Sequence, residues 1–131
     1  FQGALDDTWE VSGCPMSTMG MSSGKFGTWA TWESRGQVFV SRIDALENLK
    51  PERPGEEGGK NKHPAFAQSD SGQGLLAWSM GSGWQKPGQL AYQFFDRSGH
   101  PVGESILGEP MAVWNRPAVY ARPDGRLGII Y

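Results

Sequence analysis

The chain has 131 residues, which is enough for one domain with a modest hydrophobic core. Its formal net charge of −2 provides no long-range attraction to nucleic acid or to an anionic membrane, and no apolar run approaches the roughly 20 residues that a membrane-spanning helix needs. The 19 glycines and six tryptophans favour an all-β fold, because glycine permits tight turns and large aromatic side chains fill the space between sheets.

The N-terminal residues 1–3 resemble the end of a viral protease site that is used to remove expression tags. We interpret them as a tag remnant and residues 4–131 as the folded segment. On this interpretation the N-terminus carries no information on localisation. A first strand is expected near residues 8–12.

The single cysteine, Cys14, has no partner for an intramolecular disulfide. We interpret it as a small buried apolar residue, and a bridge to a part of the native protein outside this chain is the alternative. Together with Met16, Met19 and Met21 it also raises a soft-metal hypothesis, since thiolate and thioether ligands select Cu(I). The ordinary explanation is that flexible methionines fill gaps beside an inner strand. We predict no cofactor.

An internal repeat organises the rest of the chain. The segment from Pro64 to Trp78 recurs from Pro117 to Tyr131, at a separation of 53 residues. A weaker copy ends at Trp32, 46 residues before Trp78. A period near 50 residues matches the four-stranded blade of a β-propeller, with variation in loop length.

Strand signals follow one another within each unit, as alternating or aromatic-rich runs bounded by glycine turns. The predicted strands of the first unit cover 27–33 and 37–44, and those of the second cover 64–68, 74–80, 89–96 and 101–107. The stretch 47–62 is rich in proline, glycine and charge and is predicted to be a flexible loop. The result is about two and a half blades: the first at about 14–46, the second at about 63–108 and a partial third at about 115–131.

Distinctive motifs lie at 9–15, 63–65, 76–78 with 83–84, 90–101 and 122–131. They resemble the bacterial sialidase-like propellers, which are six-bladed rings with BNR-type repeats in secreted proteins. The resemblance implies that this chain is the C-terminal portion of such a ring and that it is secreted or periplasmic. Two or three blades cannot close a ring, so closure needs missing sequence or a second copy of the chain.

The catalytic features of true sialidases have no match in this chain. Gln68 replaces the first serine of the sialidase Ser-x-Asp-x-Gly-x-x-Trp box, and no arginine cluster with a Tyr/Glu pair and an acid Asp is found. The leading hypothesis is therefore a non-catalytic ligand-binding or assembly scaffold, with a glycan as the candidate ligand. The alternatives are part of a sialidase-type glycoside hydrolase whose catalytic residues lie mostly outside this chain, and a tryptophan-rich lectin that closes its ring by oligomerising.

Propeller geometry predicts where a ligand would bind. Loops that enter the inner strands and loops that join the second and third strands lie on one face of the ring. His63 and Arg116 directly precede the prolines that open two inner strands, at positions equivalent to Cys14, and the loop 80–88 would overhang the same face.

Four residues on this face are candidate ligand-binding residues: His63, Trp84, Lys86 and Arg116. His63 is a potential metal ligand or general base, or else makes a structural hydrogen bond at a blade junction. Trp84 would stack on a sugar or pack as a lid. Arg116 would pair with a ligand carboxylate, or else with Glu109.

Overall fold

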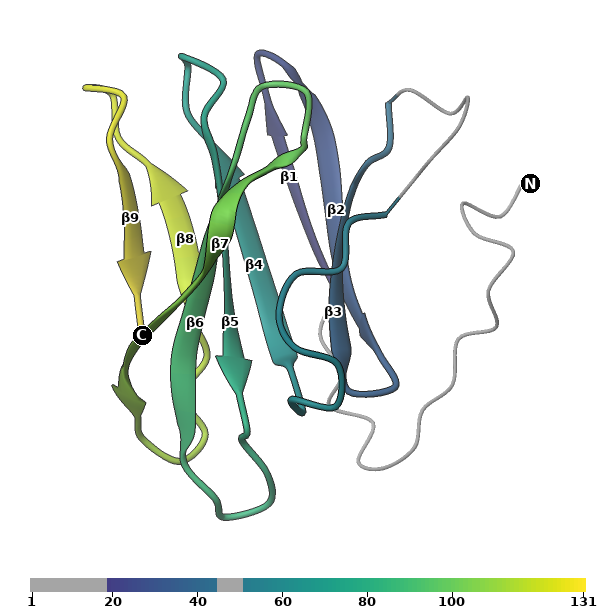
Figure 1. Cartoon of the computed structure of the whole chain (residues 1–131). Coiled ribbons are helices and arrows are strands. Elements are labelled where there is room, and N and C mark those ends of the chain that lie inside the picture. Colours follow the sequence, from purple (N-terminus) through teal and green to yellow (C-terminus); the bar gives the residue numbers. More distant parts are fainter. Residues whose placement is uncertain (1–18, 45–50) are drawn as a thin grey trace.

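The computed structural model describes residues 19–44 and 51–131 (Figure 1). These residues form an all-β structure of antiparallel sheets without a helix, as the composition and the strand signals predict. None of the described segments forms a helix that could cross a membrane. The described strands are β1 (Gly20–Gly24), β2 (Gly27–Ser34), β3 (Gln37–Arg42), β4 (Lys62–Gln68), β5 (Gly74–Met80), β6 (Gly88–Phe95), β7 (Pro101–Met111), β8 (Ala118–Ala121) and β9 (Leu127–Ile130).

The described strands make three sheets, with orders β1-β2-β3, β4-β5-β6-β7 and β8-β9. The sheets stack one against the next. Strand β4 contacts β1 and β2 on one side and β8 on the other (Figure 1). The predicted strand 74–80 is confirmed at both ends by β5. The strand predicted near 8–12 falls outside the described residues.

Strand β7 extends four residues beyond the predicted end at 107 and reaches Met111. Two irregularities in the pairing of β6 with β7 make this possible, since they let the longer strand follow its neighbour. Side chains of β6 bond the bulged backbone: Gln93 Nε2 donates to the carbonyl of Gly103 at 2.8 Å, and Gln89 Nε2 to that of Gly108 at 3.0 Å.

The central strand β5 is buried on both faces. Leu76 and Trp78 belong to the larger apolar cluster, which includes Trp29 and Phe66 from the neighbouring strands β2 and β4. Ala77 points the other way, into a smaller cluster against which β8 and β9 pack. Burial on both faces explains why β5 reads as an almost continuous apolar run instead of an alternating one.

A row of hydrogen bonds joins the first and second sheets. Alternate side chains of β2 are buried, and each bonds to a residue of β4. The hydroxyl of Thr31 donates to the carbonyl of Pro64 at 3.3 Å, and the carboxylate of Glu33 accepts from the His63 N–H at 3.3 Å. The indole of Trp29 donates to Gln68 at 3.2 Å in the same row. The two sheets are therefore held in one register.

The segment 51–61, the described part of the predicted loop, is attached to β3 and β5. Glu52 exchanges two backbone hydrogen bonds with Val40 of β3, at 3.0 and 3.2 Å. Asn61 is fully buried, donates to Gln37 Oε1 at 3.1 Å and accepts from Trp78 Nε1 at 2.9 Å. A buried amide in this position ties three segments together, because each bond satisfies a polar atom that water cannot reach.

Replacing Asn61 by alanine should destabilise the fold. The substitution leaves the buried indole N–H of Trp78 without its acceptor, which costs about 2 kcal/mol in the free energy of unfolding. Urea denaturation followed by tryptophan fluorescence measures this loss. Gln73→Ala, which removes an amide from an exposed turn, is the matched control. Equal unfolding midpoints for the two variants would contradict the role given to Asn61.

Candidate functional site

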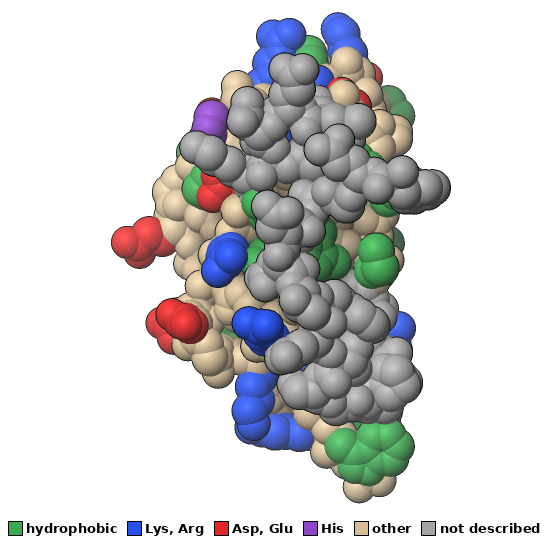
Figure 2. All heavy atoms as spheres, turned by 90° about the vertical axis from the view of Figure 1, so that its right-hand side faces the viewer, with side chains coloured by type: hydrophobic (Ala, Val, Ile, Leu, Met, Phe, Trp, Pro, Cys, Tyr) green, Lys and Arg blue, Asp and Glu red, His purple; other side chains and the backbone are tan. Residues whose placement is uncertain are grey.

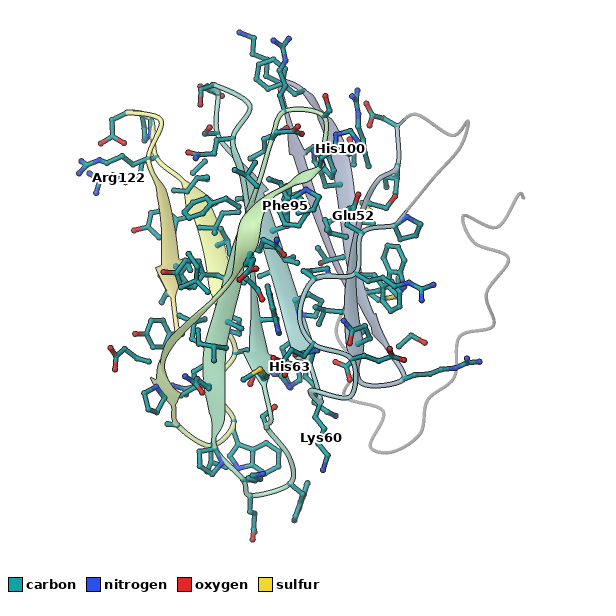
Figure 3. All side chains as sticks on the ribbon, viewed as in Figure 1. Glu52, Lys60, His63, Phe95, His100 and Arg122 are labelled. Carbon is teal, nitrogen blue, oxygen red and sulfur yellow. The ribbon has the colours of Figure 1, made fainter. Side chains whose placement is uncertain are left out.

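The four predicted ligand-binding residues line one small pocket of about 80 Å³. It lies at the end of the sheets where β4 begins and β5 ends, the end at which Figure 3 labels His63. Three segments form it: the start of β4, the loop 81–87 and the loop 112–117. The lining residues are Lys62, His63, Ser82, Gly83, Trp84, Lys86, Ala112, Trp114, Asn115 and Arg116.

The loop between β5 and β6 is a narrow hairpin that projects beyond the sheets (Figure 1). Its tip is closed by two backbone hydrogen bonds between Gly83 and Lys86, at 3.3 and 3.1 Å. Its base is fixed to the preceding segment, because the N–H of Gly81 donates to the carbonyl of Gly59 at 3.1 Å. Trp84 and Lys86 are therefore carried on a braced turn.

Trp84 packs against Trp114 from the neighbouring loop. The two rings are edge to face, with centroids 4.9 Å apart and an interplanar angle of 84°. Both indoles remain open to solvent, with 73% of Trp84 and 52% of Trp114 exposed. Figure 2 shows a hydrophobic side chain exposed at the lower end of the face that it presents, and the hairpin projects from the lower end of the sheets in Figure 1. Such an aromatic corner offers apolar planes to a ligand.

Backbone strain is concentrated around the pocket. Five non-glycine residues in the described part of the chain have positive φ, and His63, Gln85 and Trp114 are three of them, at 55°, 52° and 72°. His63 and Trp114 line the pocket, and Gln85 lies at the tip of the hairpin. Left-handed conformations of non-glycine residues cost energy and cluster at functional sites.

A buried carboxylate contacts the two residues of β4 that line the pocket. Glu33 of β2 is only 6% exposed, accepts the hydrogen bond from the backbone of His63 and lies 3.6 Å from Lys62 Nζ. Partial burial lowers the pKa of the His63 imidazole, and the positive charges of Arg116 and Lys62 add to this effect, whereas Glu33 opposes it. The lowered pKa favours the neutral form of the imidazole.

Two buried hydroxyls at the base of the hairpin have no hydrogen-bond partner among the described residues. They are Ser79 Oγ and Ser82 Oγ, and Ser82 lines the pocket. Both side chains lie close to Gly88, so that a Cβ atom added at Gly88 would come within 2.9 Å of each of them. Unpaired buried hydroxyls are rare in folded proteins, so the pair marks this end of the molecule as a place for a polar ligand or water.

The described residues test some of the other predictions made from the sequence. Within the described residues Arg116 forms no ion pair, with Glu109 or any other carboxylate. No group of three His, Cys, Asp or Glu residues in the described part could hold a metal ion. The soft-metal hypothesis stays a prediction, because Cys14 and Met16 lie outside the described residues; Met19 and Met21 are exposed.

Sequence reasoning missed the lining residues Trp114, Lys62 and Asn115, and also the buried Glu33 beside Lys62. The signal for Trp114 was present, since it lies between two repeat units in a stretch without strand character, and Trp84 lies in a similar stretch within the second unit. Glu33 carried no such signal, because its role depends on how β2 faces β4.

The lining residues are suited to binding. They supply cationic groups, two indoles, an amide and a hydroxyl, but no carboxylate, whereas glycoside hydrolysis generally uses a pair of carboxylates. Comparison with known proteins adds no family: no family model, curated protein or solved structure matches this chain.

The depressed pKa of His63 predicts a pH dependence of stability. The unfolded chain takes up a proton near pH 6.5, whereas the folded chain does so only at lower pH. Stability is therefore full above about pH 6.5 and falls as the pH drops towards the folded-state pKa. Urea denaturation between pH 7.5 and 5 should show this slope, and His63→Gln should flatten it. The second histidine provides the control: if His100→Gln flattens the slope equally, the assignment to His63 is wrong.

Proposed function

We propose that the chain is a segment of a β-propeller and that it serves as a non-catalytic scaffold that binds a carbohydrate. Support for the propeller comes from the succession of antiparallel sheets, in which the first strand of each sheet lies beside the first strand of another: β4 contacts both β1 and β8. In a propeller these are the innermost strands of consecutive blades. The first sheet has three strands, and the position of a fourth is taken by the single Glu52–Val40 bridge.

The observation that carries the binding function is the convergence at the pocket. His63, Trp84, Lys86 and Arg116 come from three segments that are remote in sequence, and they meet beside an exposed pair of indoles. The apolar planes of exposed tryptophans complement the C–H faces of sugar rings, and the surrounding donors can bond hydroxyl groups. By the resemblance stated above, this binding would take place in a secreted or periplasmic protein.

Removal of either indole should weaken saccharide binding. Trp84→Ala and Trp114→Ala each delete one wall of the aromatic corner, so each should weaken binding to the saccharides of a glycan array by about tenfold or more. Leu107→Ala removes an exposed apolar side chain of β7 outside the pocket and should bind like the parent chain. Turnover of a fluorogenic glycoside by the chain would support an enzyme instead.

A second candidate function is a lectin that completes its ring with further copies of the chain. The favouring observation is the third sheet, whose two strands leave Tyr120 and Ile130 exposed by 42% and 63%. A two-stranded sheet is marginally stable alone, so covering its open face stabilises it. Light scattering after size exclusion distinguishes the candidates: a defined oligomer supports the ring-forming lectin, and a monomer excludes it.

A further inference from the structure

Positive charge is concentrated at the pocket although the chain as a whole has a formal net charge of −2. Lys62, Lys86 and Arg116 line the pocket, no carboxylate is among the described lining residues, and the buried Glu33 lies 3.6 Å from Lys62 Nζ. Lys86 and Arg116 have no ion-pair partner among the described residues. Two cations that line the same small pocket without an ion-pair partner among the described residues favour an anion, since the opposite charge reduces their mutual repulsion.

The size of the pocket limits what can enter it. Its volume of about 80 Å³ is well below the roughly 300–1,000 Å³ of pockets that enclose a drug-sized ligand. A charged substituent therefore fits, and a complete sugar ring does not. The ring would remain outside, where Trp84 and Trp114 are exposed.

The donors that line the pocket come from three separate segments of the chain. Lys62 and His63 come from the start of β4, Lys86 from the hairpin and Arg116 from the loop before β8. The unpartnered hydroxyl of Ser82 adds a further donor. A planar carboxylate is satisfied by a single bidentate arginine, whereas a tetrahedral oxyanion presents oxygens in several directions.

We propose that this pocket binds a tetrahedral oxyanion, a sulfate ester or phosphate monoester carried by the saccharide that lies on Trp84 and Trp114. The inference rests on the proposed carbohydrate-binding function. The proposal predicts that binding depends on pH, because an anion beside His63 favours the protonated imidazole. The negative charge of Glu33 acts in the same direction, whereas the positive charges of Lys62 and Arg116 oppose protonation. Affinity for the sulfate ester should therefore rise as the pH falls towards the lowered pKa of the His63 imidazole, whereas a phosphate monoester itself takes up a proton at about pH 6 and should gain less.

Calorimetric titration with four matched disaccharides tests the proposal: neutral, O-sulfated, O-phosphorylated and carboxylated. At low salt the sulfated or phosphorylated form should bind at least about tenfold more tightly than the neutral and carboxylated forms, and salt should reduce the difference. Arg116→Met and Lys86→Met should remove the preference, because each should lower the affinity for the sulfated and phosphorylated forms more than the affinity for the neutral form. Arg116→Lys, which keeps the charge, should retain most of it.

Arg122→Met is the matched control, because Arg122 lies at the opposite end of the sheets from His63 (Figure 3). It should leave every affinity unchanged. Equal binding of the carboxylated form would overturn the tetrahedral oxyanion, and equal binding of the neutral form would overturn any anion. Either result leaves the carbohydrate function standing.

A failure of the carbohydrate function can also be distinguished from a failure of the oxyanion site. If no disaccharide binds but inorganic sulfate or phosphate shifts the His63 imidazole resonances, and Arg116→Met abolishes that shift, the oxyanion site stands and the carbohydrate function fails. If inorganic sulfate and phosphate cause no such shift and no disaccharide binds, both proposals are wrong.

Discussion

The row of hydrogen bonds between β2 and β4 positions the end of the molecule that carries the candidate site. Two stacked sheets held only by apolar contacts can slide, whereas buried polar groups must meet their partners at one register. The bonds from Thr31 to the Pro64 carbonyl and from the His63 N–H to Glu33 set that register. The same carboxylate holds the left-handed backbone at His63 and lies beside Lys62, so the packing of the sheets and the geometry of the pocket share one side chain.

The pocket itself consists of loops that are anchored in a rigid base. Strand β5 is covered on both faces, and the buried amide of Asn61 connects its Trp78 to the segment that leads into β4. The hairpin with Trp84 and the loop with Trp114 extend from this base, and each contains a non-glycine residue with positive φ. Binding groups on braced loops are preorganised, because the cost of ordering them is met when the protein folds.

Much of the candidate site was accessible to sequence reasoning. The repeat placed His63 and Arg116 at equivalent positions before two prolines, and the glycine-flanked loop drew attention to Trp84 and Lys86. The role of Glu33 beside the site could not be predicted from the sequence. Glu33 is 30 residues from His63, and the alternation of β2 shows only that one face is buried, not which strand lies against it.

The sequence by itself determined the all-β class, the β5 boundaries and most of the other strand positions to within a few residues, because alternation, glycine turns and aromatic runs act over a few neighbouring residues. Only the tertiary structure decided that β4 lies between β2 and β8, that Trp84 meets Trp114, and that the cations converge on one recess. These features depend on contacts between segments far apart in the chain. Their geometry follows from how whole sheets stack, which no local pattern encodes.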